Sequence, residues 1–141
     1  MKIVKNILAV VLGWLLGSFV NGGLVEIGHT VFPIEGLDTQ NFEALKVAVA
    51  EFEVHHFLFP FLAHALGTLV GAAIASLLAV GNKRNYALVV GALFLLGGII
   101  MNFFLLPGPI WFSALDILVA YIPMALIGAQ IGIKLSKKVN N

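Results

Sequence analysis

The stretch YALVVGALFLLGGIIMNFFLL, residues 86–106, decides the fold. It carries no charged side chain, and at 1.5 Å per residue it would form about 30 Å of helix, the thickness of a bilayer's hydrocarbon core. Three further apolar stretches of similar length occupy residues 7–28, 57–80 and 110–134. Because lipid offers no partner to the backbone of an open strand, each of the four is expected to be a transmembrane helix.

The composition of the whole chain supports this prediction. Of its 141 residues, 60% are hydrophobic and only 11% are charged, with a mean hydropathy of +1.04, whereas a soluble domain carries roughly a quarter charged residues. We therefore predict one transmembrane domain over residues 1–141, an all-α integral membrane four-helix bundle. The absence of cysteine excludes thiol chemistry, and a net charge of +1 without a basic stripe argues against nucleic-acid binding.

One long connection separates the first two spans. Within it, Phe42, Leu45, Val49 and Phe52 recur at helical spacing, with charged residues between them. This pattern predicts an amphipathic helix over residues 41–54 that lies on the membrane surface.

The basic residues predict the orientation. Seven of the eight lysines and arginines fall before span one, between spans two and three, or at and after the end of span four. Cytoplasmic loops are enriched in Lys and Arg, so both termini are expected to be cytoplasmic, in a multi-pass protein of the cell (inner) membrane. The loop of residues 30–56 would then face outward, with Lys46 as its one basic residue.

Glycines at four-residue spacing indicate close helix packing. One interpretation is a tight bundle within the chain. The other is association, either with a second copy or with partner subunits, in which the pairs on spans two and four face partner helices. The residues concerned are Gly13, Gly17, Gly67, Gly71, Gly128 and Gly132.

The ionisable residues are distributed unevenly. Every acidic residue and every histidine falls in the outer loop or in the outer half of a span. Such groups are costly at membrane depth and mark function by default. If they face inward, they could form one site, with Glu26, His29, His64 and Asp116 at its core and support from four others, Asn21, Glu53, His56 and Asn102.

A metal site is one interpretation of this group. Glu26 with His29, and Glu53 with His56, each form a Glu-x-x-His motif. Two such motifs on separate helices of a bundle can hold two metal ions, completed by carboxylates such as Asp116. A divalent metal is therefore one candidate cofactor, beside a small molecule or lipid headgroup, and purely structural hydrogen bonding is the other reading.

His64 and Asp116 are singled out because both should lie below the membrane interface, where an unpaired charge is very costly. A carboxylate beside an imidazole could orient it for proton transfer, or the pair could simply fix the bundle's register. Pro123 lies a few residues beyond Asp116 and should kink the fourth span.

Three functions are compatible with these patterns. The first is a binding protein for a small molecule, lipid headgroup or metal, with its site in the outer half of the bundle. The second is a structural or accessory subunit of a larger membrane complex. The third is a small membrane enzyme that uses His64 and Asp116 as an acid/base pair, which we regard as less favoured because no nucleophile or substrate motif accompanies them.

Overall fold

The computed structural model describes residues 1–139, and within that range every regular element is helical. The elements in chain order are α1 (Lys2–Val31), α2 (Phe42–Ala48), η1 (Val49–Glu51), η2 (Val54–Phe57), α3 (Leu58–Leu78), α4 (Lys83–Ile100), the π-helix η3 (Met101–Leu105), α5 (Ile110–Val119) and α6 (Ile122–Val139).

Four helical segments of the described chain are long and apolar enough to cross a membrane. They are Lys2–Val31, Val54–Leu78, Lys83–Leu105 and Ile110–Lys138. The prediction of four membrane-capable helices is therefore confirmed. Large apolar side chains such as Phe19, Phe104 and Leu118 are exposed on the outside of the bundle, as lipid-facing side chains would be.

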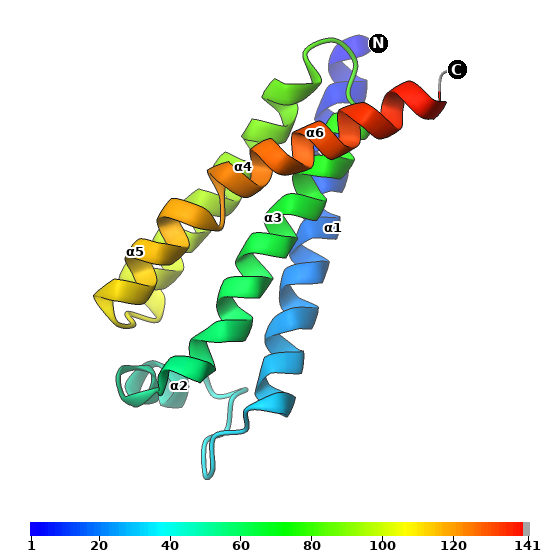
Figure 1. The fold of residues 1–141 in the computed structure, drawn as a ribbon. Coiled ribbons are helices and arrows are strands. Elements are labelled where there is room, and N and C mark those ends of the chain that lie inside the picture. Colours follow the sequence, from blue (N-terminus) through cyan, green and yellow to red (C-terminus); the bar gives the residue numbers. More distant parts are fainter. Residues whose placement is uncertain (140–141) are drawn as a thin grey trace.

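The bundle has two distinct ends (Figure 1). The start of α1, the end of α6 and the α3–α4 turn lie together at one end, which we call the termini end. The segment of residues 32–57 covers the opposite end, the loop end. Helix α3 is central, because it packs against α1, α4 and α6.

Glycines bring the backbones of α1 and α3 into contact. A Cβ added at Gly13 would lie 2.5 Å from the carbonyl oxygen of Gly71, and one at Gly17 would lie 2.5 Å from that of Gly67. On α6, a Cβ at Gly128 or Gly132 would collide with the backbone of α3. All six predicted packing glycines therefore lie against another helix of the same chain, so these stripes are not available to a partner helix.

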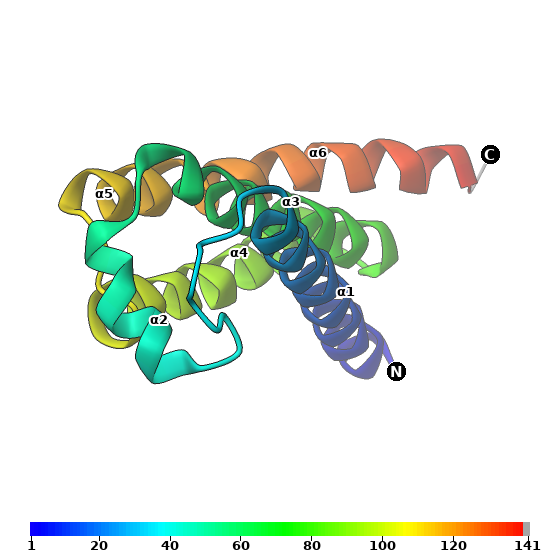
Figure 2. The ribbon, with the colours of Figure 1, turned by 90° about the horizontal axis from the view of Figure 1, so that it is seen from below.

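The helix predicted over residues 41–54 is only partly correct. It starts as expected, since the Asn41 side chain accepts a hydrogen bond from the Ala44 amide, but α2 ends at Ala48 and a short 3₁₀ turn follows. Phe52 and Glu53 are extended because Glu53 caps the next turn, η2, together with His56. Instead of continuing one helix, the chain crosses the loop end in short segments (Figure 2).

The fourth span is broken, as Pro123 predicts. Helix α5 ends at Val119 and α6 begins at Ile122, because proline has no amide hydrogen to donate to the carbonyl four residues earlier. The Ala120 amide still donates to the Asp116 carbonyl at 2.9 Å, which closes α5. The break leaves Tyr121 at the turn between two helices.

Helix α4 also ends irregularly. The Leu106 amide donates to the Met101 carbonyl at 2.8 Å, so the last turn is a π turn. A π turn is one residue wider than an α turn and often occurs at functional sites. This turn contains Asn102, which is buried inside the bundle.

Candidate functional site: a buried carboxylate between two cavities

The site is built around Asp116 of α5, whose side chain is 0% exposed. Both of its carboxylate oxygens lie 2.9 Å from Nδ1 of His64, on α3. Asn102 Nδ2 donates to Oδ2 at 2.7 Å, and the Tyr121 hydroxyl donates to the same oxygen at 2.7 Å. Side chains from α3, from η3 and from the turn after α5 thus converge on one carboxylate, and the two residues singled out from the sequence are in direct contact.

These contacts compensate the cost of burying a carboxylate. An unpaired charge away from water is very unfavourable, but hydrogen bonds from several donors to a carboxylate are strong. The Tyr121 oxygen also lies 2.9 Å from Nδ1 of His64. Asp116, His64 and Tyr121 therefore contact one another mutually, and Asn102 adds a further bond to the carboxylate.

The network determines which ring nitrogen of His64 is available to bind another molecule. With Asp116 ionised, Nδ1 of His64 donates to it, and a neutral ring then carries a lone pair on Nε2. Within the described residues, the hydrogen bonds of His64 all involve Nδ1. The His64 side chain is 16% exposed and lines two cavities. Nε2 is therefore the ring atom left to contact a bound molecule.

The larger of the two cavities, the cap cavity, has a volume of about 370 Å³ and lies at the loop end. Of the residues predicted to form the site, Glu26, His29, His56, His64 and Asn102 line it. The other side chains that line it are mainly apolar. Four of these belong to the apolar face predicted for the outer helix, namely Phe42, Leu45, Val49 and Phe52.

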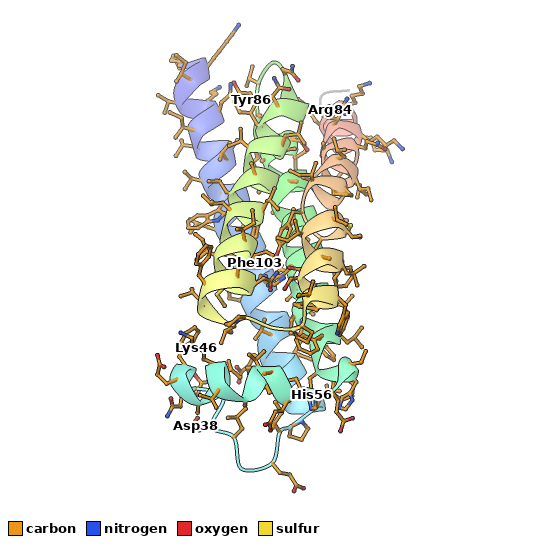
Figure 3. All side chains as sticks on the ribbon, turned by 90° about the vertical axis from the view of Figure 1, so that its left-hand side faces the viewer. Asp38, Lys46, His56, Arg84, Tyr86 and Phe103 are labelled. Atoms are coloured by element: carbon orange, nitrogen blue, oxygen red, sulfur yellow. The ribbon has the colours of Figure 1, made fainter. Side chains whose placement is uncertain are left out.

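The apolar side chains of α2 and the residues after it line the cap cavity, so this face covers the loop end of the bundle. That the helix also lies on the membrane surface stays a prediction. Figure 3 shows α2 crossing the loop end of the four spans, with Lys46 and His56 at that end.

The smaller cavity, the side cavity, has a volume of about 240 Å³ and lies between α1 and α4. It meets the cap cavity at His64 and Met101, which line both. Asn21, predicted to support the same site as Glu26, lines this second cavity instead. The outer-half polar residues therefore divide into two groups on either side of His64.

The described residues do not form the two-metal centre suggested by the sequence. Among residues 1–139, no group of three or more His, Asp or Glu side chains is placed to hold a metal ion. The second Glu-x-x-His motif is used locally, because the Glu53 amide donates to Nδ1 of His56 at 3.1 Å. The Glu53 carboxylate is 76% exposed and lies 3.4 Å from His55 Nδ1, and Glu53 does not line the cap cavity.

Tyr121 was not identified from the sequence. A tyrosine in an apolar span usually attracts no notice, but its hydroxyl needs a partner when buried, and Tyr121 is 1% exposed. The sequence signal that could have identified Tyr121 is its position, two residues before Pro123 and five after Asp116. Gly98 of α4 makes room for it, because a Cβ there would overlap the Tyr121 ring and hydroxyl.

Comparison of the chain with protein-family models, with curated proteins and with solved structures found no match.

Proposed function

We propose that this protein is a four-span membrane protein that binds a neutral or cationic amphiphile in the cap cavity, with His64 as the hydrogen-bond acceptor. The observation that carries the proposal is the fixed His64 ring. Asp116 holds Nδ1 at 2.9 Å, so that Nε2 can accept a hydrogen bond from a molecule in the cavity.

The distribution of charge supports an orientation for this site. The basic residues at the termini end are Lys2, Lys5, Lys83, Arg84, Lys134, Lys137 and Lys138. Lys46 lies at the loop end (Figure 3). The positive-inside bias then puts both termini in the cytoplasm, and the cap cavity in the outward half of the bilayer.

The cavity's lining defines the class of ligand. Most of its walls are apolar, and its polar groups include the Glu26 carboxylate and three imidazoles, without a Lys or Arg side chain. An anionic headgroup would meet Glu26 with no fixed cation to balance it. A neutral group that donates hydrogen bonds, or an ammonium group, would be favoured.

Two probes of matched chain length test this proposal. Native mass spectrometry of the purified protein would count decyltrimethylammonium and decyl sulfate bound at equal concentration. We expect one bound decyltrimethylammonium per chain and a clear preference over decyl sulfate. Glu26→Gln should reduce that preference, because it removes the carboxylate from the cavity wall.

Histidine variants locate the binding. His64→Asn keeps a donor close to Asp116 but removes Nε2, the ring nitrogen that we propose accepts the ligand's hydrogen bond, and binding of decyl alcohol, a neutral donor, should weaken about tenfold, the loss of roughly 1.4 kcal/mol. His55→Asn is the matched control, since His55 is exposed and does not line the cavity. Equal binding of both charged probes, unchanged by Glu26→Gln, together with decyl alcohol binding that is unchanged by His64→Asn, would show that the cap cavity is not the site.

A second candidate function has one observation in its favour. A carboxylate that holds Nδ1 of an imidazole, where the imidazole residue lines a cavity, is an arrangement suited to a general base. In this version a cavity-bound molecule would lose a proton to His64. Turnover of such a molecule should then be lost in both His64→Asn and Asp116→Asn, whereas simple binding leaves the molecule chemically unchanged in every variant.

A further inference from the structure

The side cavity contains polar groups that the proposed function does not use. Trp14, Ser18 and Asn21 lie on one face of α1, at the i, i+4, i+7 spacing of helix neighbours, and all three line this cavity. No hydrogen bond joins the side chain of Ser18 or Asn21 to any other residue in the described range 1–139. An amide without a partner at membrane depth is costly, so a molecule that accepts its hydrogen bond would bind favourably.

The lining of the side cavity excludes charge. The residues around it are Trp14, Ser18, Asn21, His64, Leu93, Phe94, Gly97, Gly98, Met101 and Tyr121. They include no acidic side chain, lysine or arginine, in contrast to the cap cavity with Glu26. An ionic headgroup would find no counter-charge here, so the occupant should be uncharged and soluble in lipid.

The hydrogen-bond donors and the shape of the side cavity restrict the chemical class of its ligand further. The indole of Trp14, the hydroxyl of Ser18 and the amide of Asn21 can each donate a hydrogen bond, which suits a ligand with carbonyl oxygens. On the opposite side Gly97 leaves the backbone of α4 bare, because a Cβ there would meet nothing within 4 Å, and Phe94 also lines this wall. A flat ring can pack against such a wall more closely than a branched group can.

We propose that the side cavity binds the ring of an uncharged, lipid-soluble carbonyl compound of the quinone type, which enters from the bilayer between α1 and α4. Asn21 donates to a ring carbonyl, and the ring packs against Gly97. The linings of this site and of the cap cavity share only His64 and Met101, and the proposal does not depend on the ligand proposed for the cap cavity.

Trp14 provides a direct readout of this site. The chain contains two tryptophans, so Trp111→Phe leaves Trp14 as the sole tryptophan, which can be excited selectively at wavelengths where tyrosine does not absorb. Decylbenzoquinone, added to this variant in phosphatidylcholine nanodiscs, should quench Trp14 with saturation. Decylbenzene has the ring and chain without the carbonyls, and it should fail to displace the quinone.

Two further substitutions in the Trp111→Phe background test the geometry. Asn21→Leu removes the amide donor at nearly constant size, and Gly97→Leu extends a side chain into space that is open within 4 Å of a Cβ. Each should weaken the saturable quenching at least about tenfold. Gly22→Leu is the matched control: its Cβ would also meet nothing within 4 Å, it lines neither cavity, and it should leave quenching unchanged.

The result that would overturn the proposal is quenching that rises linearly with quinone and is equal in all variants, which is what simple partitioning into the bilayer produces. Quenching that saturates but is insensitive to both Asn21→Leu and Gly97→Leu would also overturn it, by placing the quinone elsewhere. Binding of decyltrimethylammonium in the cap cavity should be unaffected by either substitution, so failure here and failure of the proposed function give different results.

Discussion

Nδ1 of His64 lies 2.9 Å from each carboxylate oxygen of Asp116, although the two residues are 52 positions apart in the chain. The contact fixes the imidazole ring between two cavities and leaves Nε2 free to meet a ligand. The same contact links α3 to α5, so the interaction that orients the His64 ring also holds two helices together.

The carboxylate of Asp116 should be needed for both stability and binding. Asp116→Asn replaces one acceptor oxygen with an amide that faces the donors of Asn102, Tyr121 and His64. We expect the free energy of unfolding to fall by about 1–3 kcal/mol, because at least one buried donor loses its acceptor. Loss of helical circular dichroism as sodium dodecyl sulfate is added to dodecyl maltoside micelles would measure the change.

Glu51→Gln is the matched control for that substitution, because Glu51 is exposed at the loop end. It should shift the unfolding curve very little. If Asp116→Asn unfolds at the same detergent ratio as the wild type and binds the cap-cavity probes equally well, then the carboxylate network does not hold the site together.

The Tyr121 hydroxyl should contribute measurably to the same network. Tyr121→Phe removes its donated bond to Asp116, and a hydrogen bond to a charged group is worth about 1.5–3 kcal/mol. Tyr86→Phe provides a comparison at the termini end, where the hydroxyl accepts a bond from Asn6 Nδ2 at 2.8 Å. The neutral bond should cost less, about 0.5–1.5 kcal/mol. Equal losses in the same unfolding assay would argue against an ionised Asp116.

Two adjacent glycines on α4 should differ sharply in their tolerance of a methyl group. At Gly98 the added Cβ would overlap the Tyr121 ring, whereas at Gly97 it would meet nothing within 4 Å. Gly98→Ala should therefore displace Tyr121 and cost about 1–3 kcal/mol of stability, as overpacked sites do. Gly97→Ala should be close to neutral. Similar unfolding curves for the two variants would show that α4 and Tyr121 are not packed as described.

The sequence was sufficient to predict the four membrane-capable helices, because the length and apolarity of a span are properties of contiguous residues. It also predicted the break in the fourth span, because Pro123 cannot donate a backbone hydrogen bond. It also singled out His64 and Asp116, since ionisable groups inside apolar helices are rare and costly. Depth along a helix, however, does not determine which side of the bundle a residue faces. Asn21 was for this reason grouped with Glu26, although the two line different cavities.

Other features depend on tertiary contacts that have no local signal. The π turn that contains Asn102 is one, and the pairing of Tyr121 with Gly98 is another. The helix expected over residues 41–54 was too long, because hydrophobic periodicity continued through Phe52 while Glu53 and His56 formed a cap of their own. A cap that competes with helix continuation is difficult to recognise from periodicity alone.

The orientation of the bundle can be tested by cysteine labelling, since the chain has no cysteine of its own. Asp38→Cys places a thiol in the exposed loop at one end, and Asn82→Cys places one in the exposed turn at the other. With both termini cytoplasmic, a membrane-impermeant maleimide should label residue 38 in intact cells and residue 82 only after lysis. The reverse pattern would invert the proposed topology.

The proposed function depends most directly on the protonation of His64, which nitrogen-15 NMR can report. The triple variant His29→Gln, His55→Asn, His56→Gln leaves His64 as the only native histidine, and its two ring nitrogens can then be assigned in nanodiscs. A proton on Nδ1 and a bare Nε2, changed by Asp116→Asn, is the predicted result. A neutral ring protonated at Nε2, with signals indifferent to Asp116→Asn, would contradict it.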